Sequence, residues 1–361
     1  MSLLSGNEND RHDGQADSHV NSRITLHGGP RDGDAVLHAD AREGPAVRGW
    51  RRLRIAHAPW GWSFGGALLV WIATMFLYGA GVAGNVVETA LVYAIFMVLV
   101  GLGQMLVMTS GVGNIDLSVP STIGLAGVVG MRIMAGEDAH IAAGVAAVLG
   151  IGVVVGLANF ALIRLLRIPP IIATLSSSFI IQSIAITQSR NLPGPPTLLG
   201  AFATGRLLHL PYIALTALAL SIGVAVLLHR SLYGRKLSAI GQNTRAAWLA
   251  GVNVSTTRCL AYVMSACIAA LTALLLSAAS GGAALDMGNE YMLISIAVVV
   301  IGGTLVTGGR ASVLGVWGAS MFLYLMTAML NAMGADAGAR SLVYGILIVS
   351  VTAVAGSKVA R

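Results

Sequence analysis

Long apolar runs constrain the fold of this chain more than any other feature of its sequence. From residue 62 onward they recur at lengths of about 20 residues, and an α-helix of that length crosses the hydrocarbon core of a bilayer. Hydrophobic residues make up 56% of the 361 residues and charged residues only 10%, a balance typical of membrane proteins. Lipid offers no partner to free backbone groups, so the runs predict an all-α polytopic integral membrane protein with about ten transmembrane helices.

The apolar runs also divide the chain into two parts. We expect helices over ten ranges: 62–79, 87–109, 119–135, 140–163, 170–188, 210–228, 259–280, 291–306, 312–333 and 341–356. Together they form one transmembrane domain over residues 59–361. Residues 1–58 are polar, mixed in charge and without a helical or strand period, which predicts a disordered cytoplasmic tail. The histidines of this tail are irregularly spaced, so no metal site is predicted.

Lysine and arginine are distributed unevenly between the predicted loops. With the N-terminus in the cytoplasm and the distal tail left aside, fourteen of these bases fall at cytoplasmic ends and four at external ends. Such a bias is typical of membrane topology. It favours ten helices, because one helix more or fewer would invert every later loop, and it predicts that both termini are cytoplasmic.

The largest polar segment between apolar runs covers residues 229–258. It carries five bases and no acid, which predicts a cytoplasmic loop. Asn243 is expected to cap a short helix and Gly251 to end it. The apolar side of that helix holds Ala246, Ala247, Trp248 and Ala250. A short helix on the membrane face suits docking to a partner protein.

Two glycine-rich segments interrupt the apolar runs without a proper polar loop. We name residues 110–120 the first glycine break and residues 302–310 the second glycine break. The two breaks are six helices apart, and the chain crosses the membrane in the same direction as it enters each of them. Paired interruptions favour a transport pathway, because unwound backbone at membrane depth must line a cavity or be buried by protein. Tight turns between helices are the alternative, and the sequence leaves both open.

Asp116 is the only acid deep within the apolar surroundings of the first glycine break. An ionisable group at that depth is a candidate for function, whereas capping of the next helix by Asp116 or Ser118 is the alternative. Neutral amides and hydroxyls suit an uncharged solute, although each alone also serves to join helices. The candidate residues of a solute pathway are Gln104, Asn114, Asp116, Ser118, Asn159, Thr174, Gly302, Gly303 and Thr304.

Motifs for chemistry are scarce in this chain. It has no G-x-x-x-x-G-K-[ST] segment to cradle phosphates, so we expect no ATP hydrolysis by this chain. H-E-x-x-H and C-x-x-C are absent too, and neither a catalytic residue nor a metal site is predicted. A transporter built this way takes its energy from another subunit or couples to an ion.

An ordered set of motifs along residues 65–356 resembles one known family. They read IDLSV at 115–119, IPPIIATL at 168–175, AIGQN at 239–243, AGVNV at 250–254, AYVMSA at 261–266, VVIGGT at 299–304 and GGR at 308–310. In this order they resemble the membrane permeases of bacterial ABC-type monosaccharide importers, the ribose, xylose and arabinose group. None of the motifs alone would suffice, but the set is specific.

The resemblance implies an importer made of two permease subunits, two cytoplasmic ATPase subunits and a periplasmic or extracellular solute-binding protein. This chain would be the permease, a multi-pass protein of the bacterial inner membrane that forms a homodimer in lipid and binds no nucleic acid. It would bind no cofactor and would not be an enzyme, because ATP and Mg are used by the ATPase. Its coupling loop to the ATPase would include Gly241, Asn243, Arg245, Ala246, Ala247, Gly251 and Val252.

Three departures from the family pattern leave the sugar unidentified. The segment before Asp116 is longer than usual, Pro120 stands where the family generally has Gly, and Met292 stands where many members have Glu. An ABC permease for branched-chain amino acids or nucleosides is an alternative. Another is an ion-coupled secondary transporter, which would need Asp116 to titrate or to bind sodium.

Overall fold

The computed structural model describes residues 60–208 and 210–359, with side chains through residue 350, so the predicted tail over 1–58 lies outside the described residues. In chain order the elements are α2 Gly61–Tyr78, α3 Ala80–Thr109, α4 Val119–Met134, η1 Asp138–His140, α5 Ile141–Leu165, α6 Pro170–Gln188, α7 Thr197–Thr204, β1 Arg206–Leu207, β2 Leu210–Pro211, α8 Tyr212–Arg230, α9 Leu232–Gln242, α10 Thr244–Leu249, α11 Val254–Ala279, α12 Tyr291–Ile301, α13 Val313–Ala332 and α14 Ala337–Val359. β1 and β2 form a short antiparallel pair. The predicted all-α fold class is confirmed.

Each of the ten predicted ranges overlaps one apolar helix, although α3, α11 and α14 begin four to seven residues earlier than predicted. Within the described chain, seven helices are long and apolar enough to cross a membrane: α2, α3, α5, α6, α8, α11 and α13. α4 has 16 residues and α12 has 11. These helices rise about 24 Å and about 17 Å, less than the roughly 30 Å of a hydrocarbon core. The helix predicted over 291–306 is therefore corrected, because α12 ends at Ile301 and Gly303 adopts a φ of +85°.

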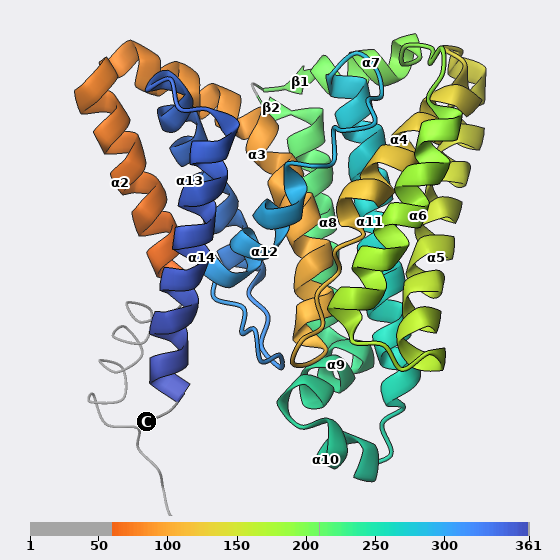
Figure 1. The fold of residues 1–361 in the computed structure, drawn as a ribbon. Coiled ribbons are helices and arrows are strands. Elements are labelled where there is room, and N and C mark those ends of the chain that lie inside the picture. The colour runs from red at the N-terminus through yellow and green to blue at the C-terminus, as the bar shows by residue number, and fades with distance from the viewer. Residues whose placement is uncertain (1–59, 209, 360–361) are drawn as a thin grey trace, which may run out of the picture. The chain divides into compact units, whose positions relative to one another are not determined.

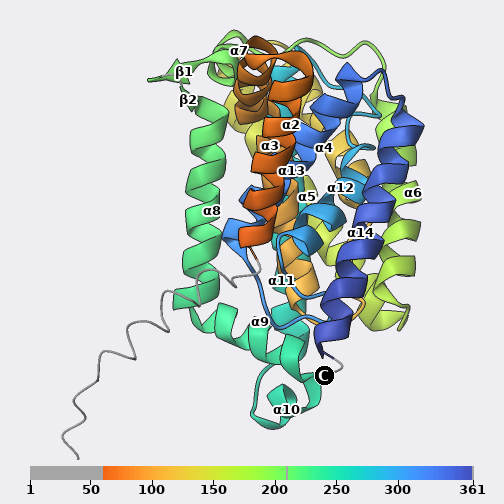
Figure 2. The ribbon, with the colours of Figure 1, turned by 90° about the vertical axis from the view of Figure 1, so that its left-hand side faces the viewer.

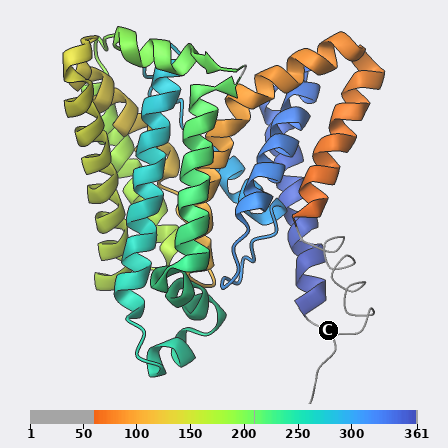
Figure 3. The same ribbon diagram turned by 180° about the vertical axis from the view of Figure 1, so that it is seen from behind.

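α3 and α11 occupy the centre of the described helices. Of the residues in an 18-residue apolar stretch of each helix, 83% are buried in α3 and 67% in α11. α4, α5 and α6 pack on the side of α11, whereas α2, α13 and α14 lie on the other side of α3 (Figures 1 and 3). α9 and α10 lie at one end of these helices, and α7 with β1 and β2 at the opposite end (Figure 2). We call these the α10 end and the α7 end.

Glycine lets the backbones of α5 and α11 touch. A methyl carbon built at Gly152 would lie 2.6 Å from Cys267 Cα, and one at Gly156 would overlap Val263 Cα. These two glycines are four residues apart and therefore face the same side of α5. Small residues at this spacing are typical of helix pairs in lipid, where association depends on close packing rather than on the hydrophobic effect.

The bases lie at the ends that the charge pattern indicates. Arg164 is in the last turn of α5, and Arg310 is in the second glycine break, both at the α10 end. Arg132 is in the last turn of α4, and Arg340 is in the first turn of α14, both at the α7 end. The alternation of the ten helices is thus consistent with the predicted distribution of charge.

Candidate functional site

Residues 229–258, the predicted coupling loop and from here on the coupling segment, contain two short helices rather than one. α10 has the predicted caps: Asn243 Oδ1 accepts the backbone N–H of Ala246 at 3.0 Å, and Gly251 adopts a φ of +81° and donates to the Trp248 carbonyl at 2.9 Å. α9 precedes it and was not predicted. Ser231 caps α9, because its Oγ accepts the N–H of Gly234 at 3.1 Å. Two consecutive capped helices give this segment a defined shape.

The side chains of α10 do not form one apolar face against the rest of the chain. Ala247 is 5% exposed, but Trp248 is 65% exposed and Leu249 is 71% exposed. Arg245 beside them is exposed as well. Ala247 therefore belongs to the packing of the segment, whereas the two large apolar side chains point away from it.

Three segments that are distant in the sequence meet backbone to backbone at the α10 end. Gly309 N–H donates to the Thr109 carbonyl at 2.9 Å. A methyl carbon at Gly241, in the last turn of α9, would overlap both of these atoms. One at Gly308 would lie 2.7 Å from Gly111 Cα. We call these five residues the glycine junction, which joins α9 to both glycine breaks (Figure 1).

Asp116 lies at the centre of a buried polar cluster and is 1% exposed. Its Oδ1 accepts the backbone N–H and the hydroxyl of Ser118, at 3.0 and 2.6 Å, and its Oδ2 accepts the Ser265 hydroxyl at 3.4 Å. The Gln104 amide pairs with the backbone N–H and carbonyl of Asp116, both at 3.2 Å. Asp116 thus stabilises the turn before α4. Neither predicted capping bond forms, because Asp116 bonds to Ser118, which precedes the helix, and the side chain of Ser118 makes no bond to the first N–H groups of α4.

α5 and α6 join the same cluster. Asn159 Nδ2 donates to the Ser118 hydroxyl at 2.7 Å, and the Ser177 hydroxyl donates to Asn159 Oδ1. Thr174 Oγ1 accepts the N–H of Leu117 at 3.0 Å. The predicted residues Gln104, Asn114, Asp116, Ser118, Asn159 and Thr174 are at most 5% exposed, and each bonds to a residue of the first glycine break or lies within it. In this conformation they connect helices.

The other predicted pathway residues, Gly302, Gly303 and Thr304, lie against the start of α13. Gly302 packs against Gly315 of α13, whose added methyl carbon would overlap the Gly302 carbonyl. Thr304 Oγ1 accepts the N–H of Ser312 at 3.3 Å, and Gly303 lies between these contacts. The nine residues therefore form two sets, and the two glycine breaks approach each other at the glycine junction. Their contact with a solute stays a prediction.

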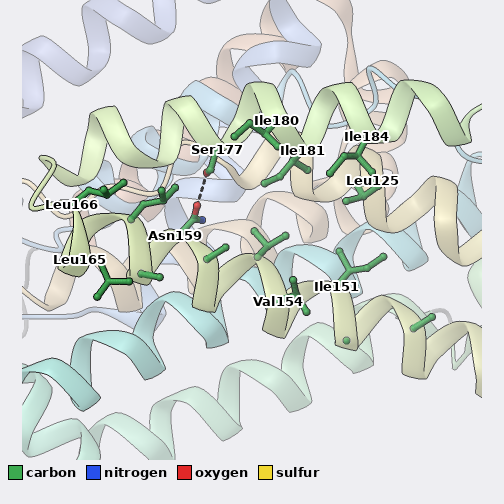
Figure 4. A pocket seen from close by; sticks show the side chains of 16 residues that line it. Leu125, Ile151, Val154, Asn159, Leu165, Leu166, Ser177, Ile180, Ile181 and Ile184 are labelled. Atoms are coloured by element: carbon green, nitrogen blue, oxygen red, sulfur yellow. Dashed lines mark hydrogen bonds between the residues drawn. The ribbon is translucent and has the colours of Figure 1, made fainter.

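A groove of about 860 Å³ runs between α5 and α6, and Leu125 of α4 also lines it. Figure 4 shows Leu165, Ile180 and Ile184 along its walls. Asn159 and Ser177 also line the groove, but their polar groups bond to each other. The groove thus presents apolar surface, which suits lipid contact better than a polar solute.

One face of α11 was missed at the sequence level. Tyr262 donates its hydroxyl to Asn114 Oδ1 at 3.4 Å, and Ser265 reaches Asp116. Arg258, at the start of the same helix, donates to the Ser110 carbonyl at 3.2 Å. Their spacing of four and three residues places polar groups on one side of an apolar helix, a signal that was available in the sequence.

Residues 61–65 read G-x-S-x-G, a pattern that occurs around some nucleophilic serines. Here it lies at the start of α2, where Ser63 is 2% exposed and donates to the Trp60 carbonyl at 2.7 Å. A nucleophile of that class stands on a sharp turn between a strand and a helix, so the pattern gives no catalytic site here.

These features define the class of the protein first: a multi-pass α-helical membrane protein with two short apolar helices next to glycine-rich breaks and a capped helical segment at one end. Residues 86–352 match the family model described as "Branched-chain amino acid transport system / permease component". The chain belongs to this permease family and is a transport subunit. The predicted resemblance to permeases of ABC-type importers is confirmed.

Relatives of known name support the same assignment. The chain is 31% identical to the autoinducer 2 import system permease protein LsrD of Yersinia enterocolitica, over 66% of this chain and 74% of the relative. It is 27% identical to LsrD of Photorhabdus temperata, over 80% and 90%. It is 29% identical to the fructose import permease protein FruG of Bifidobacterium longum, over 81% and 92%. No solved structure gives a significant match.

Proposed function

We propose that this chain is the membrane-spanning subunit of an ATP-driven importer for a monosaccharide or a similar small polar solute. α9 and α10 dock on a separate ATPase subunit that uses ATP and Mg, and the chain moves the solute without covalent chemistry. It lies in the bacterial inner membrane with the α10 end and both termini in the cytoplasm. An external solute-binding protein delivers the solute at the α7 end, and a second copy of the chain completes the pathway.

The observation that carries this proposal is the exposed turn of α10. Trp248 and Leu249 present large apolar side chains on a helix that is fixed by the caps at Asn243 and Gly251. The surrounding segment, residues 229–258, is basic and contains no acid. Exposed large apolar groups on a rigid polar segment are typical of protein contacts, in which aromatic anchors contribute most of the affinity.

The solute class is supported by the named relatives, which import autoinducer 2 and fructose. The amides and hydroxyls around Asp116 are neutral hydrogen-bonding groups that suit such a solute if the helices separate. The family description supports a branched-chain amino acid as a second candidate. Uptake of radiolabelled fructose and of radiolabelled leucine by cells that express the complete system separates the two.

Co-purification from cells that contain the neighbouring proteins tests the docking step. Trp248→Glu and Leu249→Glu are sharper probes than a change at Ala247, because Ala247 is buried within the segment. We expect an ATPase subunit to accompany the wild type and to be lost from both variants. Leu198→Glu on α7, where Leu198 is 63% exposed, is the matched control and should retain the ATPase. A chain that purifies alone and transports in liposomes without ATP would instead favour an ion-coupled secondary transporter.

A further inference from the structure

Three residues on one face of α11 bond to three residues of the first glycine break. Arg258 Nε–H donates to the Ser110 carbonyl at 3.2 Å, at the start of the break. One turn later Tyr262 reaches Asn114, and Ser265 reaches Asp116, each at 3.4 Å. Positions separated by four and three residues lie on one face of a helix. A displacement of α11 therefore acts on the whole break, including the carboxylate at the centre of the polar cluster.

Arg258 also connects this face to the coupling segment. Its Nη2 donates to Thr244 Oγ1 at 3.1 Å, in the first turn of α10. A methyl carbon built at Gly111 would lie 3.0 Å from the same Nη2, so the guanidinium fills the space between α10 and the break. A guanidinium holds several donors in one rigid plane, and for this reason one side chain can bond to two segments at fixed angles. Lysine has one charged nitrogen and a flexible stem, so it cannot reproduce both bonds in the same geometry.

The glycine junction gives the coupling segment a second route to the same break. At the end of α9, Gly241 touches Thr109 and Gly309, and Gly309 donates to the Thr109 carbonyl. These contacts involve backbone atoms, which cannot yield by rotating a side chain. Gly308, next to Gly309, in turn contacts Gly111 of the first glycine break. Any movement of α9 and α10 must therefore shift both glycine breaks or break these contacts.

We propose that Arg258 is a positioning residue that transmits the movement of α9 and α10 to the first glycine break, and through it to the polar cluster around Asp116. This inference rests on the proposed function, because the movement comes from the docked ATPase. The exposed docking groups, Trp248 and Leu249, are separate from Arg258. Loss of Arg258 is expected to leave ATPase docking in place. The first glycine break should then no longer move when the docked ATPase moves α9 and α10.

The test follows the first glycine break directly and needs no knowledge of the solute. Val112, 76% exposed in the break, is changed to Cys in a chain whose Cys259 and Cys267 are Ser. The rate of labelling by a fluorescent maleimide is compared between the nucleotide-free complex and the complex trapped with ATP and vanadate. The comparison is repeated in Arg258→Gln, in Arg258→Lys and in the control Arg164→Gln, since Arg164 is exposed at the same end.

We expect the labelling rate to differ between the two states in the parent and in the control. In Arg258→Gln the ratio of the labelling rates in the two states should fall towards one, by about tenfold. Tenfold is the factor expected for the loss of hydrogen bonds from a charged donor. The variant complex should still trap nucleotide with vanadate. Arg258→Lys should give an intermediate ratio. If Arg258→Gln does not assemble, a reduced ratio in Arg258→Lys supports the inference and an unchanged ratio overturns it.

Two other results would also overturn the inference: a parent complex that traps nucleotide without any difference in labelling, or an Arg258→Gln complex with the parental ratio. Failure of the proposed function is recognised separately. In that case the parent chain binds no ATPase and traps no nucleotide, before any variant is compared.

Discussion

The substitution Gly241→Ala tests the glycine junction most directly. The added methyl carbon would lie 2.6 Å from Gly309 Cα and closer still to Gly309 N and the Thr109 carbonyl, whereas real Cβ contacts are essentially never under 3.0 Å. The methyl carbon must therefore move at least 0.4 Å away from Gly309 Cα, either by shifting α9 or by displacing Gly309 and Thr109, which disturbs their 2.9 Å hydrogen bond. Overpacking and a weakened buried hydrogen bond together should lower the free energy of unfolding by about 2 to 4 kcal/mol.

Gly223→Ala is the matched control. Gly223 lies within α8, and a methyl carbon built there would have no other atom within 4 Å. Since alanine favours a helix more than glycine does, this variant should be neutral or more stable by up to about 1 kcal/mol. Helix propensity alone would give Gly241→Ala the same gain, so the sign of its effect separates the close contact from propensity.

The free energy of unfolding is measured on purified protein in mixed micelles by SDS titration, with tryptophan fluorescence as the signal. We expect Gly241→Ala to unfold at lower SDS than both the wild type and Gly223→Ala. If Gly241→Ala and Gly223→Ala agree within about 0.5 kcal/mol, the close contact at the junction does not exist and the reasoning is refuted.

Three further substitutions are measured in the same way. Gly315→Ala should cost about 2 to 4 kcal/mol, because the methyl group would overlap a carbonyl of the second glycine break, and wild-type stability would contradict that packing. Asp116→Asn should cost only about 1 kcal/mol, since the amide keeps a carbonyl oxygen for Ser118. A cost above about 3 kcal/mol would instead show that the negative charge itself is required. Asn159→Leu should cost about 2 to 4 kcal/mol, because it leaves two buried hydroxyls without their amide partner, and an unchanged titration would exclude those bonds.

The sequence predicted the transmembrane helices well, because lipid demands long apolar runs and imposes the length of each one. It also predicted the caps of α10, since Asn243 and Gly251 act on backbone groups only a few residues away. It did not predict α9, whose eleven residues include bases and glycines and have no long apolar run. It overestimated α12, because residues 302–306 continue the run without continuing the helix.

The candidate site could be predicted in part. Six polar residues were selected because they are unusual among apolar neighbours, and burial without water forces such groups to bond to one another. Their partners on α11 are recognisable only as a face, because Arg258, Tyr262 and Ser265 are each unremarkable alone and share one side of the helix. The glycine junction could not be predicted, because it depends on backbone contacts between segments that are distant in the chain.

The five residues of the glycine junction meet one another through backbone atoms, because four of them are glycines and Thr109 makes its contact with the carbonyl. The polar cluster is thus joined by hydroxyls, amides and the Asp116 carboxylate, whereas α9 meets the two glycine breaks through backbone atoms. A substitution among the polar side chains of the cluster leaves the atoms of the junction unchanged, whereas any larger residue at Gly241 or Gly308 must displace them.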